Sequence, residues 1–159
     1  MKTITSFYKS PIGPIEIVCT NDKIQSISLK SKSTKSVDND LTKLVKRNLK
    51  SYFNGELSSA SSLPIKYFNL NQGTPFQIKV WKQLTKIKAS KTLTYKDISL
   101  KVNSPKAMRA VGGAVGKNPF LIFFPCHRVL GQNKKIIGFS AGIDNKKFLL
   151  NLEFIPYIN

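Results

Sequence analysis

A change in the spacing of apolar residues near residue 74 constrains the fold of this 159-residue chain more than any other feature. Before it, segments 3–10, 15–20 and 24–30 carry alternating or β-branched apolar residues between turn residues, which is the pattern of strands. After it, apolar residues recur every three or four positions, which is the helical period. The sequence therefore predicts an α+β fold, with a small sheet-plus-helix domain over 1–72 and a mostly helical domain over 73–159.

Capping residues mark where the predicted helices begin. Each one precedes an apolar stripe at helical spacing and has a side chain that accepts a hydrogen bond from the first turn. The expected caps are Asp40, Thr74, Thr94 and Ser104. The expected helices cover 40–56, 74–87, 94–102, 104–117 and 143–153.

The helices expected over 94–102 and 104–117 are separated by a brief turn, which is the arrangement of a helix-turn-helix. Helix pairs are also common in protein cores, so this pattern alone leaves both interpretations open. The run FLIFF at 120–124 is apolar throughout and is followed by Pro125. It predicts a buried strand.

The charge of the chain indicates a polyanionic partner. Lysine and arginine number 26 against 8 acidic residues, a net charge of +18. Residues 1–72 carry 11 basic and 5 acidic groups (+6), and residues 73–159 carry 15 and 3 (+12). Nucleic acid is the first candidate, and the C-terminal half should face it. A generally basic proteome or a solubility strategy is the alternative.

Several classes of protein are excluded by composition. No stretch approaches the roughly 18 apolar residues of a membrane span, and the N-terminal segment MKTITSFYKS lacks the apolar core of a secretory signal. Two cysteines and one histidine make neither a disulfide framework nor the usual closed zinc site. We expect no membrane partner, no metal, and a reducing setting, cytoplasmic or, in a eukaryote, nuclear.

The only histidine of the chain, His127, directly follows Cys126 in the segment FFPCHRVL. A thiol with a pKa of about 8.5 is mostly protonated at neutral pH and needs a base to become a nucleophile. Such a base needs an acceptor to orient it, and the three acidic residues of 73–159 include Glu153, late in an apolar helix. The alternatives are a buried, inert Cys126 and an exposed helix-end charge at Glu153.

At these residues the sequence resembles the O6-alkylguanine-DNA alkyltransferases, or methylated-DNA–protein-cysteine methyltransferases. PCHRV resembles their active-site motif. Four more blocks follow the family order: GTPFQIKVWKQL, TYKDIS, SPKAMRAVGGAVGKNP and the terminal GIDNKKFLLNLE. The resemblance covers about residues 73–155, and the first 70 residues are similar only in outline, through YKSPIGPIEI.

The resemblance implies a role for each residue of the catalytic set. Cys126 would be the thiolate that accepts the alkyl group from guanine O6, and His127 the base, acting through a water. Glu153 would orient His127. Asn118 would tie the helix-turn-helix to the active-site strand. Tyr95 would press on the phosphate of the target nucleotide and help to protonate the leaving guanine.

The resemblance also implies a DNA-binding set. An enzyme cannot reach a base inside a duplex, so the nucleotide must be flipped out, and Arg109 would fill the gap. Small residues on the same helix would let its backbone approach the minor groove, although tight helix packing is the alternative explanation. The expected set is Arg109, Ala107, Ala110, Gly112, Gly113, Tyr95 and Arg128.

The pocket for the flipped base would be formed by Val129, Ser140, Phe139 and Lys146, with Lys146 bracing the pocket loop. Phe139 stands where the family often has tyrosine, Ala141 where glycine is common, and Leu121 where some members have proline. These departures bear on the size of the pocket and on which alkyl groups it prefers.

The resemblance thus implies single-turnover repair of O6-alkylguanine in double-stranded DNA, by a monomer and without a cofactor. Three other functions are the alternatives: a non-catalytic protein that binds alkyl lesions, a plain helix-turn-helix regulator, and a cysteine hydrolase. Lesion-binding relatives lack the cysteine that Cys126 provides. A regulator would leave Cys126, His127 and Glu153 without a role, and a hydrolase would need an oxyanion site.

Overall fold

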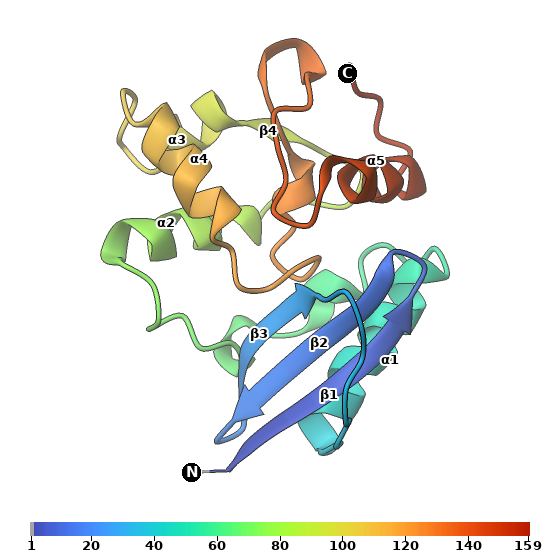
Figure 1. Cartoon of the computed structure of the whole chain (residues 1–159). Coiled ribbons are helices and arrows are strands. Elements are labelled where there is room, and N and C mark those ends of the chain that lie inside the picture. The colour runs from blue at the N-terminus through green and yellow to red at the C-terminus, as the bar shows by residue number, and fades with distance from the viewer. Residues whose placement is uncertain (1) are drawn as a thin grey trace. The chain divides into compact units, whose positions relative to one another are not determined.

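The computed structural model describes residues 2–159 and divides the chain into two compact units (Figure 1). The N-terminal unit runs to Leu70 and also includes residues 119–123, and the C-terminal unit comprises 71–118 and 124–159. The fold is mixed, with a small sheet in the first unit and helices dominating the second, as the sequence predicts. The predicted ranges 1–72 and 73–159 differ from these units because residues 119–123 pack with the N-terminal unit.

The sheet of the N-terminal unit is an antiparallel meander of β1 (Thr3–Ser10), β2 (Gly13–Thr20) and β3 (Lys23–Leu29). Asn21 and Asp22 join β2 to β3 with φ angles of 52° and 59°, the left-handed pair that a type I′ hairpin turn requires. Alternate residues of β2 are buried, as a half-buried strand demands.

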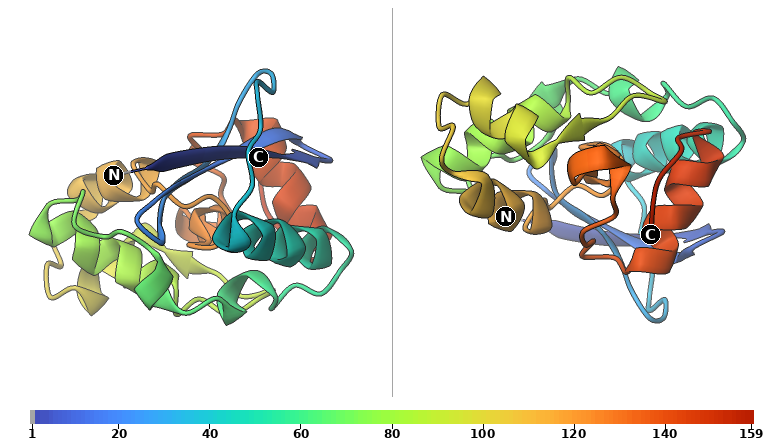
Figure 2. Two further views of the ribbon diagram at one scale, coloured as in Figure 1. Left: turned by 90° about the horizontal axis from the view of Figure 1, so that it is seen from below. Right: turned by 90° about the horizontal axis from the view of Figure 1, so that it is seen from above.

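Helix α1 (Asp40–Phe53) covers one face of this sheet, which is seen edge-on in Figure 2. Its N-cap is Asn39 and not Asp40, so that prediction was wrong. Asn39 Oδ1 accepts from the backbone N–H of Thr42 at 2.8 Å, and Thr42 Oγ1 accepts from the N–H of Asn39 at 2.9 Å. This reciprocal pair satisfies two end groups at once, whereas Asp40 lies inside the first turn, where its charge is favourable to the helix dipole. Two short 3₁₀ turns follow, η1 (Ala60–Ser62) and η2 (Ile65–Tyr67).

The run 120–124 is buried as predicted, but it is not a strand. Ile27 N donates to Pro119 O at 2.8 Å and Leu121 N donates to Ile27 O at 2.9 Å, so contact with β3 is limited to one parallel bridge. Ile122 then has a φ of 70°, which ends any extended conformation. The apolar side chains predict the burial of this run, but the apolar pattern does not predict the backbone turn at Ile122.

The C-terminal unit contains the four remaining α-helices: α2 (Pro75–Leu84), α3 (Tyr95–Lys101), α4 (Met108–Gly116) and α5 (Ile143–Leu152). Thr74 and Thr94 cap α2 and α3 with reciprocal hydrogen bonds, which confirms both predictions. Ser104 does not cap α4. Its carbonyl instead accepts from Ala107 N at 2.9 Å in a turn that delays the helix to Met108.

Two short strands set the geometry of this unit. β4 (Leu93–Thr94) pairs in parallel with β5 (Val129–Leu130). β4 runs directly into α3, and β5 directly follows the 3₁₀ turn η3 (Cys126–Arg128). The pairing therefore fixes Tyr95, the first residue of α3, close to the Cys126 turn. A further 3₁₀ turn, η4 (Gln132–Lys134), precedes α5.

Within residues 2–159, no helix has the length and apolar content needed to cross a membrane.

Candidate active site and DNA-binding surface

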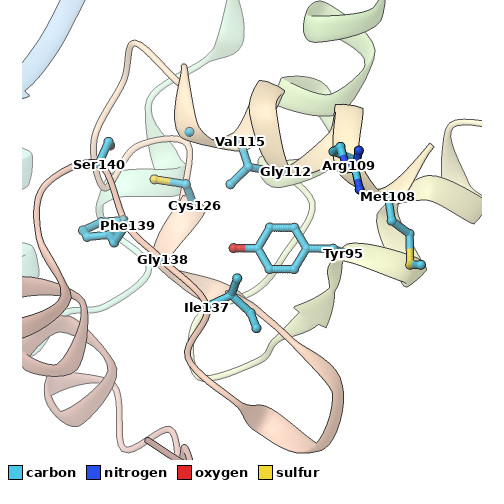
Figure 3. Close-up of a pocket in the computed structure, with 11 residues that line it drawn as sticks. Tyr95, Met108, Arg109, Gly112, Val115, Cys126, Ile137, Gly138, Phe139 and Ser140 are labelled. Atoms are coloured by element: carbon cyan, nitrogen blue, oxygen red, sulfur yellow. The ribbon is translucent and has the colours of Figure 1, made fainter.

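Cys126 lies in a 3₁₀ turn rather than in a strand, because Pro125 precedes it with a ψ of 70°. Its side chain is almost fully buried but lines a cavity of about 450 Å³ in the C-terminal unit. In Figure 3 the Tyr95 ring spans this cavity, and its hydroxyl points toward the Cys126 side. Cys126 is thus buried without being enclosed by packing, unlike the inert cysteine considered as its alternative.

The walls of the cavity come from three places in the chain. Tyr95 projects from α3 and the loop after β5 provides the opposite wall (Figure 3). Helix α4 supplies the third wall with Met108, Arg109, Gly112, Val115 and Gly116. The loop residues are Ile137, Gly138, Phe139 and Ser140.

Burial raises the pKa of the Cys126 thiol, while the Asn118 side chain and the charge of Lys146 act in the opposite direction. The resting thiol is therefore protonated at neutral pH, and it needs a base at the moment of reaction. Asn118 Nδ2 also donates to the carbonyl of Phe124 at 2.7 Å. This bond ties the chain just after α4 to the chain just before Cys126.

Glu153, just after α5, is fully buried and accepts hydrogen bonds on both oxygens. His127 Nε2 bonds to Oε2. Arg128 Nε donates to Oε1 at 2.8 Å, and the backbone N–H of Ser90 donates to Oε1 at 3.0 Å. Burial alone would raise the pKa of Glu153, but these partners outweigh it and lower the pKa to about 2. The alternative of an exposed helix-end charge is wrong.

The ionised Glu153 determines the tautomer of His127. A carboxylate only accepts, so Nε2 must donate, and the basic lone pair of a neutral imidazole is then on Nδ1. Burial lowers the pKa of His127, and Glu153 opposes this only in part. His127 is therefore neutral at neutral pH and able to accept a proton.

Arg128 is not positioned to bind DNA, contrary to the prediction. It is 2% exposed, and besides Glu153 it donates from Nη1 to the carbonyl of Ile87 at 2.7 Å. Its guanidinium supplies the permanent positive charge that keeps Glu153 ionised. The sequence does not indicate this structural role of Arg128. The prediction was that an arginine beside Cys126 and His127 would face the polyanion, and its burial with Glu153 becomes visible only in the fold.

Lys146, on α5, is buried beneath the cavity loop. Its Nζ donates to Gly138 O at 2.9 Å and to Val129 O at 2.8 Å, and it lies 5.8 Å from the centre of the Phe139 ring. These contacts join the loop to β5, and a role of Lys146 in holding a bound base stays a prediction. The Val129 side chain is fully buried and its carbonyl is bound to Lys146, so Val129 is a support of the loop and does not line the cavity.

Three glycines of α4 do not serve helix packing in this unit. A methyl group added at Gly112, Gly113 or Gly116 would meet nothing within 4 Å. Arg109 and Ala110 are exposed, and Ala107 is half-buried. The opposite side of α4 packs on α2, where Trp81 Nε1 donates to Ala114 O at 2.9 Å. The helix therefore leaves a face of low bulk open beside the cavity.

Several lining residues were missed by sequence reasoning. Val115 lies three residues after Gly112 and so on the same face of α4, a spacing that could have revealed it. Ile137 and Gly138 lie on an irregular loop, and no periodic pattern indicates where such residues point. No cluster of His, Cys, Asp and Glu among residues 2–159 has the make-up of a metal site. A reaction without metal or cofactor stays a prediction.

Comparison with known proteins places this site in a family. Residues 75–155 match the DNA-binding domain of 6-O-methylguanine DNA methyltransferase, and residues 4–67 match its ribonuclease-like domain. The chain belongs to the 6-O-methylguanine DNA methyltransferase family. It is therefore an enzyme of direct-reversal DNA repair with DNA as its partner, as the resemblance of its motifs implied.

Relatives of this methyltransferase family match over nearly the whole chain. The methylated-DNA–protein-cysteine methyltransferase of Haemophilus influenzae is 38% identical over 97% of this chain and 88% of its own length. The constitutive enzyme of Bacillus subtilis is 36% identical over 94% of each chain. Among solved structures, OGT of Mycobacterium tuberculosis in complex with DNA has a TM-score of 0.82 at 33% identity, covering 94% of this chain and 92% of that one.

Proposed function

We propose that this methyltransferase repairs O6-alkylguanine in double-stranded DNA by moving the alkyl group onto its own Cys126. One observation carries the proposal: Cys126, Tyr95 and Arg109 line a single cavity, and Cys126 is followed directly by a buried His127–Glu153 pair. The cavity volume of about 450 Å³ lies in the range of small-molecule sites. The Haemophilus influenzae and Bacillus subtilis relatives are named for this reaction.

The chemistry is one displacement at the alkyl carbon. His127 takes the thiol proton of Cys126, directly or through a water, and the sulfur forms a bond to the carbon as the bond between that carbon and guanine O6 breaks. The electron pair of the broken bond stays on the guanine, and the Tyr95 hydroxyl donates a proton to that guanine. The product is a thioether on Cys126 and an unmodified guanine.

The surroundings of Cys126 favour this sequence of events. The raised pKa of the thiol keeps it unreactive until a substrate is seated, and Lys146 and Asn118 stabilise the negative charge that develops on sulfur. Since a thioether has no route back to a thiol here, each molecule acts once. Cys126, His127 and Glu153 all lie in one copy of the chain, so we take the working unit to be a monomer.

Helix α4 would bring the damaged base to the cavity. Its open face of small residues suits close approach to a DNA groove, and exposed Arg109 at the cavity edge would occupy the space of the flipped nucleotide. Base flipping is required because guanine O6 lies inside the duplex stack.

A stoichiometry measurement tests the proposal. The protein is mixed with an excess of duplex DNA that contains O6-methylguanine, and repaired DNA is counted against protein. We expect repair to stop at one lesion per molecule, with no methanol released. Continued turnover, or release of methanol, would mean a hydrolytic reaction and would contradict the proposal.

A further inference from the structure

Six lysines gather on a surface of the C-terminal unit that shares no residue with the Cys126 cavity. They line two hollows of about 210 and 260 Å³, and the hollows adjoin because both include Gln83, Lys86 and Lys101. We call this the lysine surface. Its lysines are Lys79, Lys82, Lys86, Lys88, Lys91 and Lys101.

Helix α2 and the turn after it provide three lysines of this surface. Lys79 and Lys82 are three residues apart and so share a face of α2, and Lys86 follows in the turn just beyond its C-terminal end. The opposite face is buried through Val80, Trp81 and Leu84. The last residue of α3 and the turn after it complete the first hollow, since α2 and α3 are in contact (Figure 1).

Within residues 2–159, no acidic side chain pairs with these lysines. The 73–159 region has three acidic residues. Asp97 is engaged at the N-terminus of α3, where it accepts from Thr94 N at 2.8 Å, Glu153 is buried with Arg128, and Asp144 lies on α5. All six lysines are exposed, and none forms an ion pair in the part of the chain from 2 to 159.

Stabilisation of helix ends does not explain why six lysines gather on this surface. Lysines in the last turn complement the helix dipole, but that effect fades within one turn and needs one or two charges. Lys79 precedes the last turn of α2, and Lys88 and Lys91 lie outside any helix. Six uncompensated cations in two adjoining hollows are instead the electrostatic pattern of a surface that binds phosphates.

We infer that the lysine surface binds the sugar-phosphate backbone of the DNA beside the lesion, as a contact separate from α4. We take only the place of the lesion from the proposed function. Tyr95 and Lys101 are the first and last residues of α3, about 9 Å apart along its axis at 1.5 Å per residue. That span is under three nucleotides at about 3.4 Å each, so the flank of the same duplex is within reach.

A matched pair of triple variants tests this inference. Lys79→Gln with Lys82→Gln and Lys86→Gln removes three charges from the lysine surface. The control removes three exposed charges from the N-terminal unit, through Lys32→Gln, Lys35→Gln and Lys43→Gln. The measurement is affinity for undamaged duplex DNA, about three helical turns long, across a series of salt concentrations.

Each lost phosphate contact lowers the slope of log affinity against log salt by about 0.9, so the surface variant should lose up to about 2.7. The control should lose clearly less. An equal decrease of this slope in the two variants would mean that DNA responds to the overall charge of the protein and not to the lysine surface, and would overturn the inference.

Reaction with free O6-benzylguanine separates this inference from the proposed function. A free base needs no backbone contact, so both triple variants should react at the wild-type rate. Failure of the wild-type protein to alkylate Cys126 would overturn the proposed function and leave the comparison of salt slopes intact.

Discussion

At the scale of single residues, the position of Glu153 decides what His127 and Arg128 do. The carboxylate holds the imidazole in one tautomer through Nε2 and keeps the guanidinium out of solvent through Nε. A motif of adjacent residues, Cys126 to Arg128, therefore separates into the proposed nucleophile, the proposed base and a structural cation. The network is fully buried, so each bond is stronger than it would be in water.

Replacement of Glu153 by glutamine should slow alkyl transfer. The amide offers a weaker acceptor to Nε2 and no charge, and loss of the orienting carboxylate costs up to about 10⁴-fold in comparable triads. The measurement is the rate with free O6-benzylguanine, which does not depend on DNA binding. Asp144→Asn is the matched control, because it removes one exposed carboxylate at the start of α5 and should leave the rate unchanged.

The same variant should also be less stable, because Arg128 loses a buried partner at a cost of about 3–5 kcal/mol. The thermal midpoint is therefore measured alongside the rate, at a temperature where the variant remains folded. A folded Glu153→Gln protein that reacts at the wild-type rate would show that Glu153 only anchors Arg128, with Cys126 and His127 acting as a pair.

At the scale of elements, α4 combines two faces with different tasks. Ala114 bonds to Trp81 of α2 on one side, and Gly112 and Gly113 have open space on the other. Glycines within a helix are destabilising by about 1 kcal/mol each relative to alanine. Since packing in this unit does not require them, their small size points to an outside partner.

Replacement of Arg109 by alanine should slow repair in duplex DNA by about tenfold or more, because unstacking the target base costs a few kcal/mol without a side chain to fill the gap. Reaction with free O6-benzylguanine should be unchanged. Lys106→Ala removes an exposed charge just before α4 and controls for electrostatics. Equal losses on duplex and free base would identify Arg109 as a structural residue instead.

Element boundaries show what the sequence can and cannot predict. Thr74 and Thr94 were predicted as caps correctly because each forms a local, reciprocal pair with the residue three positions later. The predictions for Asp40 and Ser104 were wrong because other local hydrogen bonds compete. Asn39 pairs with Thr42 at the start of α1, and a turn in which Ala107 N donates to Ser104 O moves the start of α4 to Met108. Capping is predictable only where the competing local hydrogen bonds are also considered.

At the scale of the whole molecule, the pairing of strands that are far apart in the chain could not be predicted from the sequence. The parallel contact of β4 with β5 joins residues 93–94 to 129–130 and brings Tyr95 beside Cys126. Each strand has two residues, too few to show a period. The motif resemblance predicted these residues as one site, but their geometry, and the burial of Arg128, required the fold.

Stability should fall as the pH drops. The pKa of Glu153 is about 2 in the folded protein and about 4.3 in the unfolded chain. The ionised carboxylate therefore adds to the free energy of unfolding above about pH 4, and this stabilisation is lost as the pH falls toward 2. By linkage this amounts to about 3 kcal/mol. The lowered pKa of His127 acts in the same direction, with loss beginning below its unfolded pKa of about 6.5.

Unfolding by denaturant across this pH range measures the effect. The wild-type protein should lose stability steadily below about pH 6.5, and Glu153→Gln should show a flatter profile from a lower starting value. A wild-type profile that is flat between pH 7 and 3 would contradict the proposed ionisation of the buried network.

Peptide mass mapping after reaction with duplex DNA that contains O6-methylguanine shows whether Cys126 accepts the alkyl group. The other cysteine, Cys19, is buried in β2, and burial raises the pKa of its thiol to about 11, so it should remain unmodified. We expect one methyl group, on the peptide that contains Cys126. A methyl group on Cys19, or repaired DNA with neither cysteine modified, would contradict the account.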